Sequence, residues 1–205
     1  MSKKDMLGPT IRALVGVPQE RLALIADIAN RFSSETGDLW HGKIASAIQE
    51  GLETSTSADN IIRVDRSIRP AYPDWVKDVL HPELECTGPA EFDLAKVESW
   101  LHDGQKNGKW IKGEKIYEHL KSATMLESCF NLADLLAIQA RGVQTFREHF
   151  ADKAVFAWKS VVRDRYGDLS VPYLYLGGDQ VVLGWNWLVD VWNDSDPALR
   201  FASQN

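Results

Sequence analysis

The sequence has few cysteines and no long apolar run. Its two cysteines, Cys86 and Cys129, cannot form a disulfide framework, so their number fits a reducing compartment. A stretch of about 18 consecutive apolar residues occurs nowhere, and the amino terminus lacks an apolar segment of signal-peptide length. We therefore expect a cytoplasmic protein that neither spans a membrane nor carries a standard export signal.

Positive charge is scarce as well. The 205 residues carry a net charge of −6, and no segment has the basic excess expected of a dedicated nucleic-acid binder. The chain is 44% hydrophobic and 25% charged, which is typical of soluble globular proteins, and its length allows one large or two small domains. Another protein is the favoured partner, and nucleic acid is an alternative that the charge does not favour.

The common catalytic and metal-binding motifs are absent. No HExxH, Cys-x-x-Cys, GxSxG, GxxxxGK[ST] or GxGxxG pattern occurs, and the five histidines lack the spacing of a helical zinc site. The acids Asp190, Asp194 and Asp196 lack the glycine and the distant glutamate of a calcium loop. We therefore expect no metal, no cofactor and no catalytic residues.

Two weaker signals keep an enzyme as the third hypothesis. Glu114 and Glu118 lie four apart on a predicted helix and His119 follows, so the three could bind a metal or transfer protons, although a solvated helix face is the plainer interpretation. Cys129 lies near a helix start, where a thiol pKa can fall, but we expect a buried structural cysteine. Any catalytic site would have to be assembled from dispersed residues.

Periodicity predicts a helical hairpin over residues 1–53. Apolar residues at spacings of three and four indicate one helix over 18–33, and a second follows over 38–52. Residues 54–60 are small and polar and form the best linker candidate. Prolines then continue to residue 89, so we expect a linker and irregular segment over 54–90, with a short strand at 61–64 and a short helix at 73–80.

Residues 91–205 are expected to form an α+β domain ending in an antiparallel sheet. The pattern predicts helices at 114–121 and 131–141, and residues 91–101 are ambiguous between strand and helix. The valine-rich and aromatic stretch 154–188 predicts a meander of about three strands, and Asp196 before Pro197 predicts a helix over 197–202. The expected fold class is α+β, with an N-terminal helical hairpin, central helices and a C-terminal antiparallel β meander.

Strand alternation assigns the aromatic residues of the meander to two faces. A two- or four-residue turn at "LGGD" puts on one face the apolar residues Leu174, Leu176, Val181, Leu183, Trp185 and Trp187. Trp185 and Trp187 are therefore expected in the core. The opposite face is more mixed, and Trp192 lies beyond the alternation. Tyr173, Tyr175 and Trp192 are our candidates for contact with a partner.

A lysine-rich loop is the second candidate binding region. Lys106, Lys109 and Lys112 recur every three residues around Trp110, and lysine attracts phosphate while tryptophan stacks on bases. Two helices followed by a β hairpin also have the order of a winged helix-turn-helix, although the second helix is mostly apolar. The alternative function is thus a nucleic-acid-associated factor using residues 106–115, and a solvated connecting loop is the plainer interpretation.

The last fifty residues resemble the ending of a set of uncharacterised bacterial proteins. Their shared pattern is an aromatic strand ending in arginine, a glycine turn, a "VPYL" strand, and a "W-x-W-L … W" stretch with an "A-x-R" tail. Here it comprises Arg163, Gly167, Val171 to Leu174, Trp185, Trp187, Leu188, Trp192, Ala198 and Arg200. The resemblance implies a bacterial-type cytosolic protein with a defined fold and assigns no functional residue. We expect a small non-catalytic binding or interaction protein.

Overall fold

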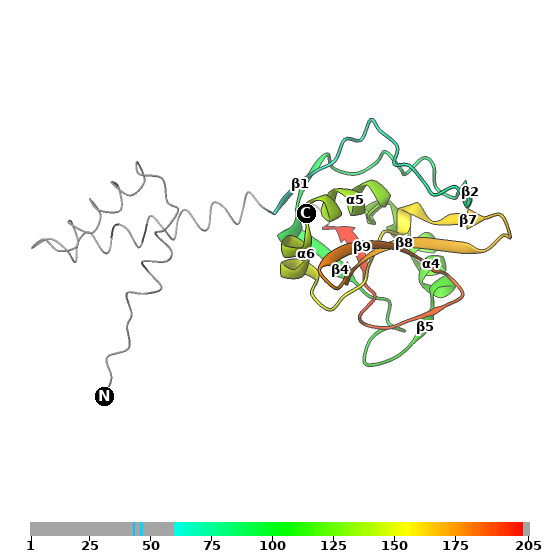
Figure 1. Cartoon of the computed structure of the whole chain (residues 1–205). Helices are drawn as coiled ribbons and strands as arrows, with labels where there is room; N and C mark the ends of the chain where they lie inside the picture. The colour runs from blue at the N-terminus through cyan, green and yellow to red at the C-terminus, as the bar shows by residue number, and fades with distance from the viewer. Residues whose placement is uncertain (1–42, 44–45, 47–59, 203–205) are drawn as a thin grey trace, which may run out of the picture. The chain divides into compact units, whose positions relative to one another are not determined.

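The computed structural model describes residues 60–202 and, before them, Lys43 and Ser46, which are helical (Figure 1). The chain divides into two compact units, residues 1–56 and residues 57–205. Apart from Lys43 and Ser46, the helical hairpin predicted over 1–53 lies outside the described residues. None of the described helices has both the length and the apolar character needed to cross a bilayer.

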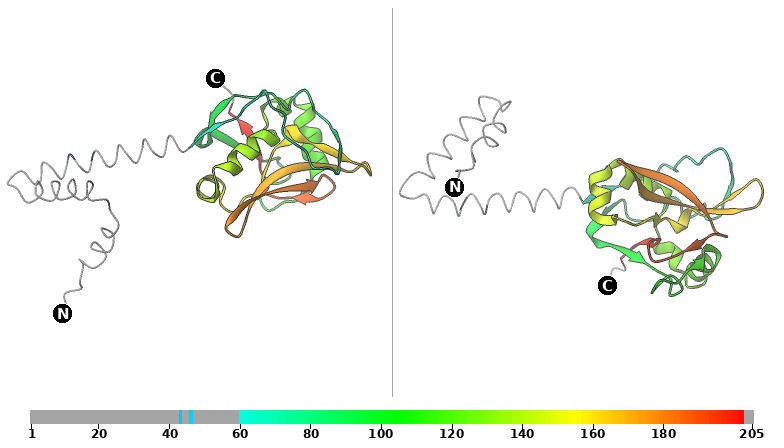
Figure 2. Two further views of the ribbon diagram at one scale, coloured as in Figure 1. Left: turned by 45° about the horizontal axis from the view of Figure 1, so that its top comes forward. Right: turned by 60° about the horizontal axis from the view of Figure 1, so that its bottom comes forward.

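A seven-stranded mixed sheet organises residues 60–202. Its strand order is β2-β7-β8-β6-β11-β4, and β9 pairs with β8. The pairing of β6 with β11 is parallel, whereas the other strand pairs of this sheet are antiparallel. The strands are β2 (Val76–Val79), β4 (Val97–Trp100), β6 (Val155–Phe156), β7 (Val162–Asp164), β8 (Leu169–Gly177), β9 (Gln180–Trp187) and β11 (Ala198–Phe201). The β8–β9 hairpin is the long orange ribbon in both views of Figure 2.

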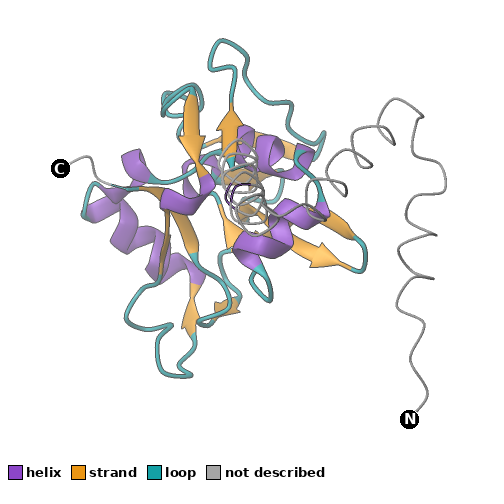
Figure 3. Cartoon of the chain, turned by 90° about the vertical axis from the view of Figure 1, so that its left-hand side faces the viewer, coloured by secondary structure: helices purple, strands orange, loops and turns teal. Residues whose placement is uncertain are grey.

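Two small sheets and several helices complete the described part. One two-stranded sheet joins β1 (Ile61–Arg63) to β3 (Glu91–Asp93), and the other joins β5 (Ile111–Lys112) to β10 (Val191–Trp192). The α-helices are α4 (Gly113–Ser122), α5 (Leu132–Ala140) and α6 (Val143–Phe150), and short 3-10 helices span Leu94–Lys96, Met125–Ser128 and Trp158–Ser160. Figure 3 shows these helices around the strands.

Local sequence explains why α5 begins where it does. The Asn131 side chain accepts a hydrogen bond from the Asp134 backbone N–H, and the Asp134 carboxylate accepts one from the Asn131 backbone N–H, which together form a capping box. Arg66 also donates to the buried Asp134 carboxylate at 2.6 Å. The helices predicted at 114–121 and 131–141 are both confirmed, as α4 and α5.

The core consists of two apolar clusters on opposite faces of the β8–β9 hairpin. Leu174 belongs to the first cluster, which includes side chains from α5 and α6, whereas Val171 belongs to the second, which includes side chains from α4. Positions 171 and 174 differ in parity, so they point to opposite faces of the strand. Figure 1 shows α5 above the hairpin and α4 below it.

The α+β fold class was wrong. The described residues contain eleven strands in three sheets and only three α-helices, and the strands extend from Ile61 to Phe201 instead of collecting at the C-terminal end. In Figure 1 strands therefore occur in colours from cyan to red. Many of these strands have only two to four residues, too few to produce the alternation by which a strand is recognised in a sequence.

Two predicted helices are strands in the structure. Residues 73–80 contain β2, whose pairing with β7 supplies the stabilisation that the short segment lacks by itself. The predicted helix over 197–202 is β11, which pairs with β4 and β6. Asp196 caps no helix there, because its Oδ2 accepts a hydrogen bond from the Asn193 backbone N–H and closes a turn. Residues 54–90 were expected as a linker and irregular segment, and their described part, 60–90, contributes β1, the predicted short strand, and β2 to the sheets.

Candidate binding site

The register of the β8–β9 hairpin agrees with the predicted assignment of its faces. Gly177 pairs with Gln180 across a two-residue turn, and Leu174 pairs with Leu183. Farther from the turn, Trp185 and Trp187 lie opposite Pro172 and Ser170, on the same face as Leu174. We call this face the tryptophan face, and the face of Tyr173 and Tyr175 the tyrosine face.

The two halves of the tryptophan face have different surroundings. Near the turn, Leu174 is buried in the core cluster that contains residues of α5 and α6, and Leu183 packs against that cluster. At the far end, Trp185 is only half-buried and Trp187 is 57% exposed. The prediction that Trp187 lies in the core was therefore wrong, because the helices cover only the half of the face near the turn.

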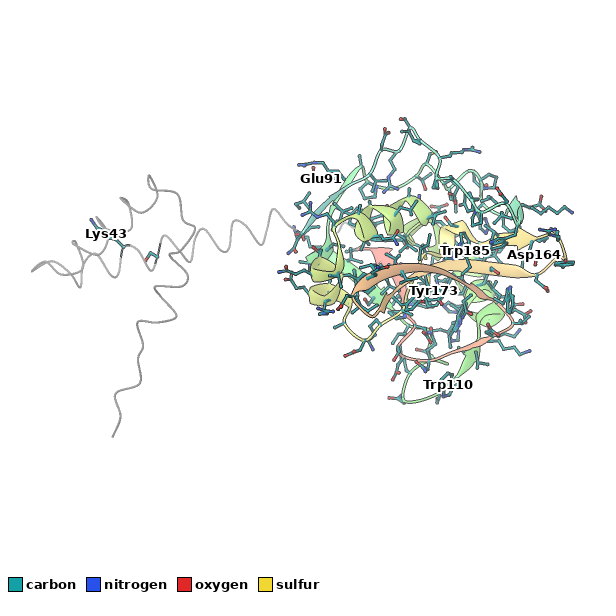
Figure 4. The ribbon with its side chains drawn as sticks, viewed as in Figure 1. Lys43, Glu91, Trp110, Asp164, Tyr173 and Trp185 are labelled. Atoms are coloured by element: carbon teal, nitrogen blue, oxygen red, sulfur yellow. The ribbon has the colours of Figure 1, made fainter. Side chains whose placement is uncertain are left out.

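A pocket with a volume of about 460 Å³ lies over the open half of the tryptophan face. We call it the aromatic pocket, and its lining residues are Trp75, Asp164, Arg165, Tyr166, Ser170, Trp185 and Trp187. Figure 4 labels Trp185 and Asp164 at the end of the hairpin away from its turn. Four of the seven lining side chains are aromatic, and they come from three separate segments of the chain.

Strand order brings these segments together. The strands β2, β7, β8 and β9 are consecutive neighbours at this end of the sheet. The pairing of Val76 with Asp164 places Trp75 beside the end of β7, and Ser170 lies between its partners Val162 and Trp187. The Trp75 ring meets the Trp185 ring edge to face, with centroids 5.4 Å apart and planes at 90°. The pocket is thus a product of the sheet topology.

A tight turn between β7 and β8 presents Arg165 and Tyr166. One carboxylate oxygen of Asp164, Oδ1, accepts hydrogen bonds from the backbone N–H groups of Tyr166 at 2.8 Å and Asp168 at 3.0 Å. Gly167, with a φ of +97°, adopts the left-handed conformation that this turn requires. Tyr166 is consequently 82% exposed at the rim of the pocket, with the Arg165 guanidinium 6.0 Å from its ring centre.

Ser170 is the buried polar group of the aromatic pocket. The residue is almost inaccessible to solvent, and its hydroxyl has no hydrogen-bond partner among the described residues. A buried hydroxyl without a partner costs free energy, roughly 1–3 kcal/mol. A ligand atom that hydrogen-bonds to Ser170 would remove that cost.

Buried hydrogen bonds anchor Glu85, in the segment that also contains the lining residue Trp75. The Ser160 hydroxyl donates to the Glu85 carboxylate and accepts from the Leu132 backbone N–H, each at 2.7 Å, and Asn131 donates to the Glu85 backbone carbonyl at 2.8 Å. Burial raises the pKa of Glu85 above its usual value. Tyr72, on the same segment, packs its ring 5.9 Å from that of Trp185, and burial followed by the nearby Glu85 raises the pKa of Tyr72.

The predicted contact residues of the hairpin region lie away from the aromatic pocket. Tyr173 stacks on Phe156 with ring centroids 4.9 Å apart and on Tyr175 at 5.5 Å, so the half-buried Tyr173 packs against the second core cluster. Trp192 is only 2% exposed, because its ring packs against Gly113 and the aromatic residues of the same cluster. Trp192 is therefore a core residue and offers no accessible surface to a partner.

The lysine-rich loop is exposed and separate from the aromatic pocket. Lys106 forms a 2.8 Å ion pair with Asp103, and Lys115 forms one with Glu118, so carboxylates offset both charges. Lys109 and Lys112 are exposed, and Trp110 is 63% exposed, far from Trp185 in Figure 4. The helix that would read bases, α5, packs on the sheet, and its Gln139 donates to the Val181 carbonyl at 2.8 Å.

The candidate catalytic groups do not converge on one cleft. Of the candidates, His119 meets a further histidine, His102, with ring centroids 4.9 Å apart, whereas Glu118 pairs with Lys115. Burial, followed by the charge of His119, lowers the pKa of His102. In the described part of the chain no group of three His, Cys, Asp or Glu residues could hold a metal ion. Cys129 is buried as expected, which raises the pKa of its thiol to about 12.

Several lining residues of the aromatic pocket could not be recognised as site residues from the local sequence pattern. Trp75 belonged to a predicted helix, and Arg165 and Tyr166 belonged to a turn recognised only as an interruption between strands. Tyr166 was the one indication of a contact surface in the sequence, because a large aromatic side chain in a tight polar turn lies at the surface of the protein. Comparison of the chain with protein-family models, with curated proteins and with solved structures gives no match.

Proposed function

We propose that this protein is a non-catalytic binding protein and that the aromatic pocket is its ligand-binding site. The observation that carries the proposal is the combination of four aromatic side chains with a buried, unpartnered Ser170 hydroxyl around one pocket. Its volume of about 460 Å³ is within the usual range for small-molecule and peptide-fragment sites.

The exposure of the aromatic side chains supports a binding role. Trp187 and Tyr166 place large apolar rings at the surface beside the half-buried Trp185. Clustered exposed aromatic residues are typical of contact surfaces, because each ring buries a large area on binding and loses little conformational entropy. The edge-to-face contact of Trp75 with Trp185 also favours binding, since a lining that is already ordered costs little entropy when a ligand arrives.

The chemistry of the lining favours binding over catalysis. Asp164 is the one carboxylate among the lining residues, and its Oδ1 already accepts two backbone N–H groups of the turn. Arg165 is a permanent cation and does not act as a base at neutral pH. The lining therefore offers recognition groups without an acid–base pair.

Nuclear magnetic resonance of the full-length protein tests this proposal. The probes are a proline-repeat decapeptide, a cello-oligosaccharide and adenosine monophosphate, and the readout is the indole N–H signals of Trp75, Trp185 and Trp187. We expect at least one probe to shift these signals, and Trp187→Ala to weaken the binding that the Trp75 and Trp185 signals report. The matched control is Trp110→Ala, because Trp110 is similarly exposed but lies outside the pocket. Unchanged pocket signals with all three probes would overturn the proposal.

A further inference from the structure

We infer that the aromatic pocket binds a proline-rich peptide segment in the polyproline II conformation, with an acidic residue beside its prolines. The inference rests on the proposed function and names its ligand class. Three features of the lining carry it: the balance of hydrogen-bond donors and acceptors, the angles between the rings, and the cation at the rim.

Donors outnumber acceptors in the lining of the pocket. The indole N–H groups of Trp75, Trp185 and Trp187 can only donate, and so can the guanidinium of Arg165. The hydroxyls of Ser170 and Tyr166 can do either, and the turn already uses Oδ1 of Asp164. The complementary ligand is therefore rich in acceptors and poor in donors.

A proline-rich segment has this composition. Each proline has a carbonyl but no N–H, and the polyproline II helix forms no internal hydrogen bonds, so all of its carbonyls are free to accept. The Ser170 hydroxyl, which has no partner among the described residues, would then donate to one peptide carbonyl. A sugar, by contrast, presents hydroxyl groups that donate as readily as they accept.

The ring angles agree with this ligand. Trp75 packs edge to face on Trp185 with the two planes at 90°, so these rings do not form one flat surface. The stacking of a flat base requires ring faces parallel to that base, which two perpendicular rings do not offer together. Aromatic-lined grooves accept proline rings and exploit the preformed peptide helix, which loses little entropy on binding.

Arg165 gives the aromatic pocket a preference for a negatively charged group in the ligand. Its guanidinium lies 6.0 Å from the Tyr166 ring centre at the rim, and no ion pair is found for it among the described residues. An arginine on an aromatic ring can also bind a carboxylate in a bidentate manner. An aspartate or glutamate next to the prolines would therefore pair with Arg165.

Peptide titrations of the full-length protein test the inference. The probes are a proline-repeat decapeptide with two flanking glutamates, the same peptide with lysines for the glutamates, and a version with alanines for the prolines. Fluorescence anisotropy of the labelled peptides measures affinity, and the indole N–H signals report the location. We expect the glutamate peptide to bind best and the alanine version to bind at least tenfold more weakly.

Four substitutions separate the contributions of individual side chains to peptide affinity. Trp187→Ala should weaken binding of the glutamate peptide roughly 30-fold, the loss typical of a central aromatic contact. Ser170→Ala should weaken it by about fivefold, since one hydrogen bond is lost. Arg165→Glu, in an exposed turn that does not depend on this side chain for folding, should reverse the preference between the glutamate and lysine peptides. Trp110→Ala should leave all affinities unchanged.

The possible failures are distinguishable. If the cello-oligosaccharide or adenosine monophosphate shifts the pocket signals and no peptide does, the peptide inference is wrong and the proposed function stands. Equal affinity for the alanine and proline peptides, or an unchanged charge preference in Arg165→Glu, would also overturn the inference. If no probe shifts the signals of Trp75, Trp185 and Trp187, both proposals fail.

Discussion

The two halves of the tryptophan face differ in what covers them. Leu174 and Leu183 lie on this face near the hairpin turn, in or against the core cluster of α5 and α6, whereas Trp185 and Trp187 lie on the same face beyond those helices. The strands and the alternation are continuous from one half to the other. Alternation thus decides which face a side chain occupies, and the elements packed on that face decide whether it is buried.

The largest effect is expected in the covered half of the face. Leu174→Ala should lower the free energy of unfolding by about 2–5 kcal/mol, because a fully buried side chain leaves a cavity. Trp187→Ala should lower it by less than about 1 kcal/mol despite the larger side chain, because most of that ring is already exposed. Chemical denaturation of both variants gives the comparison, and equal losses would contradict it.

The tyrosine face should tolerate added volume poorly. A Cβ atom at position 184 would lie 2.7 Å from the Tyr173 ring, so Gly184→Ala should cost about 1–3 kcal/mol of stability through overpacking. The same substitution combined with Tyr173→Leu should cost less than the sum of the two single changes, because the obstructing ring is gone. Denaturation of the four proteins in this cycle measures the coupling, and simple additivity would show that the ring does not pack on Gly184.

The stability of the protein should respond to pH through the buried Glu85. The pKa of Glu85 in the folded state is raised by burial, so the native state retains a proton that the unfolded state has lost. Stability contributed by this group is therefore lost as pH rises from the unfolded-state pKa through the raised folded-state pKa. We expect the difference in unfolding free energy between pH 4.5 and neutral pH to be smaller in Glu85→Gln than in the unmodified protein.

Chemical denaturation across that pH range provides the measurement. Groups such as Asp134 and Lys159, whose pKa values burial also shifts, are present in both proteins, so the difference between the two profiles isolates Glu85. Identical pH profiles for the two proteins would show that Glu85 ionises as freely in the folded state as in the unfolded state.

The lysine-rich loop should show the smallest effect. Trp110 is exposed in a loop, and Trp110→Ala should change the free energy of unfolding by less than about 0.5 kcal/mol. Thermal unfolding of this variant beside Trp187→Ala tests whether the two exposed tryptophans are equivalent for stability. A large loss for Trp110→Ala alone would indicate packing that its exposure does not reveal.

The sequence predicted the parts of the fold that depend on local pattern. The helix predicted over 131–141 is present as α5, and the "LGGD" turn gives the predicted register. The prediction failed where pairing with a strand far along the chain determines whether a short segment becomes a strand. Strands β2 and β11 are too short to be recognised alone and exist because β7 and β4 pair with them.

The candidate site was missed for the same reason. Trp185 and Trp187 were placed on the correct face, but nothing local shows that α5 and α6 cover only one half of it. Trp75 reaches the pocket through the pairing of Val76 with Asp164, which joins segments far apart in the chain. The aromatic residues of the hairpin are therefore visible in the sequence, whereas the pocket that they line depends on contacts between distant segments.

The hydrogen bond from Gln139 to the Val181 carbonyl has a consequence for self-association. In the described part of the chain β9 pairs only with β8, so it forms an edge of the large sheet. Free edges can recruit strands from other molecules and so begin aggregation. By occupying a carbonyl of this strand, α5 removes one of the acceptors that an incoming strand would need. The helix that packs on the leucines of the hairpin thus also occupies part of its exposed edge.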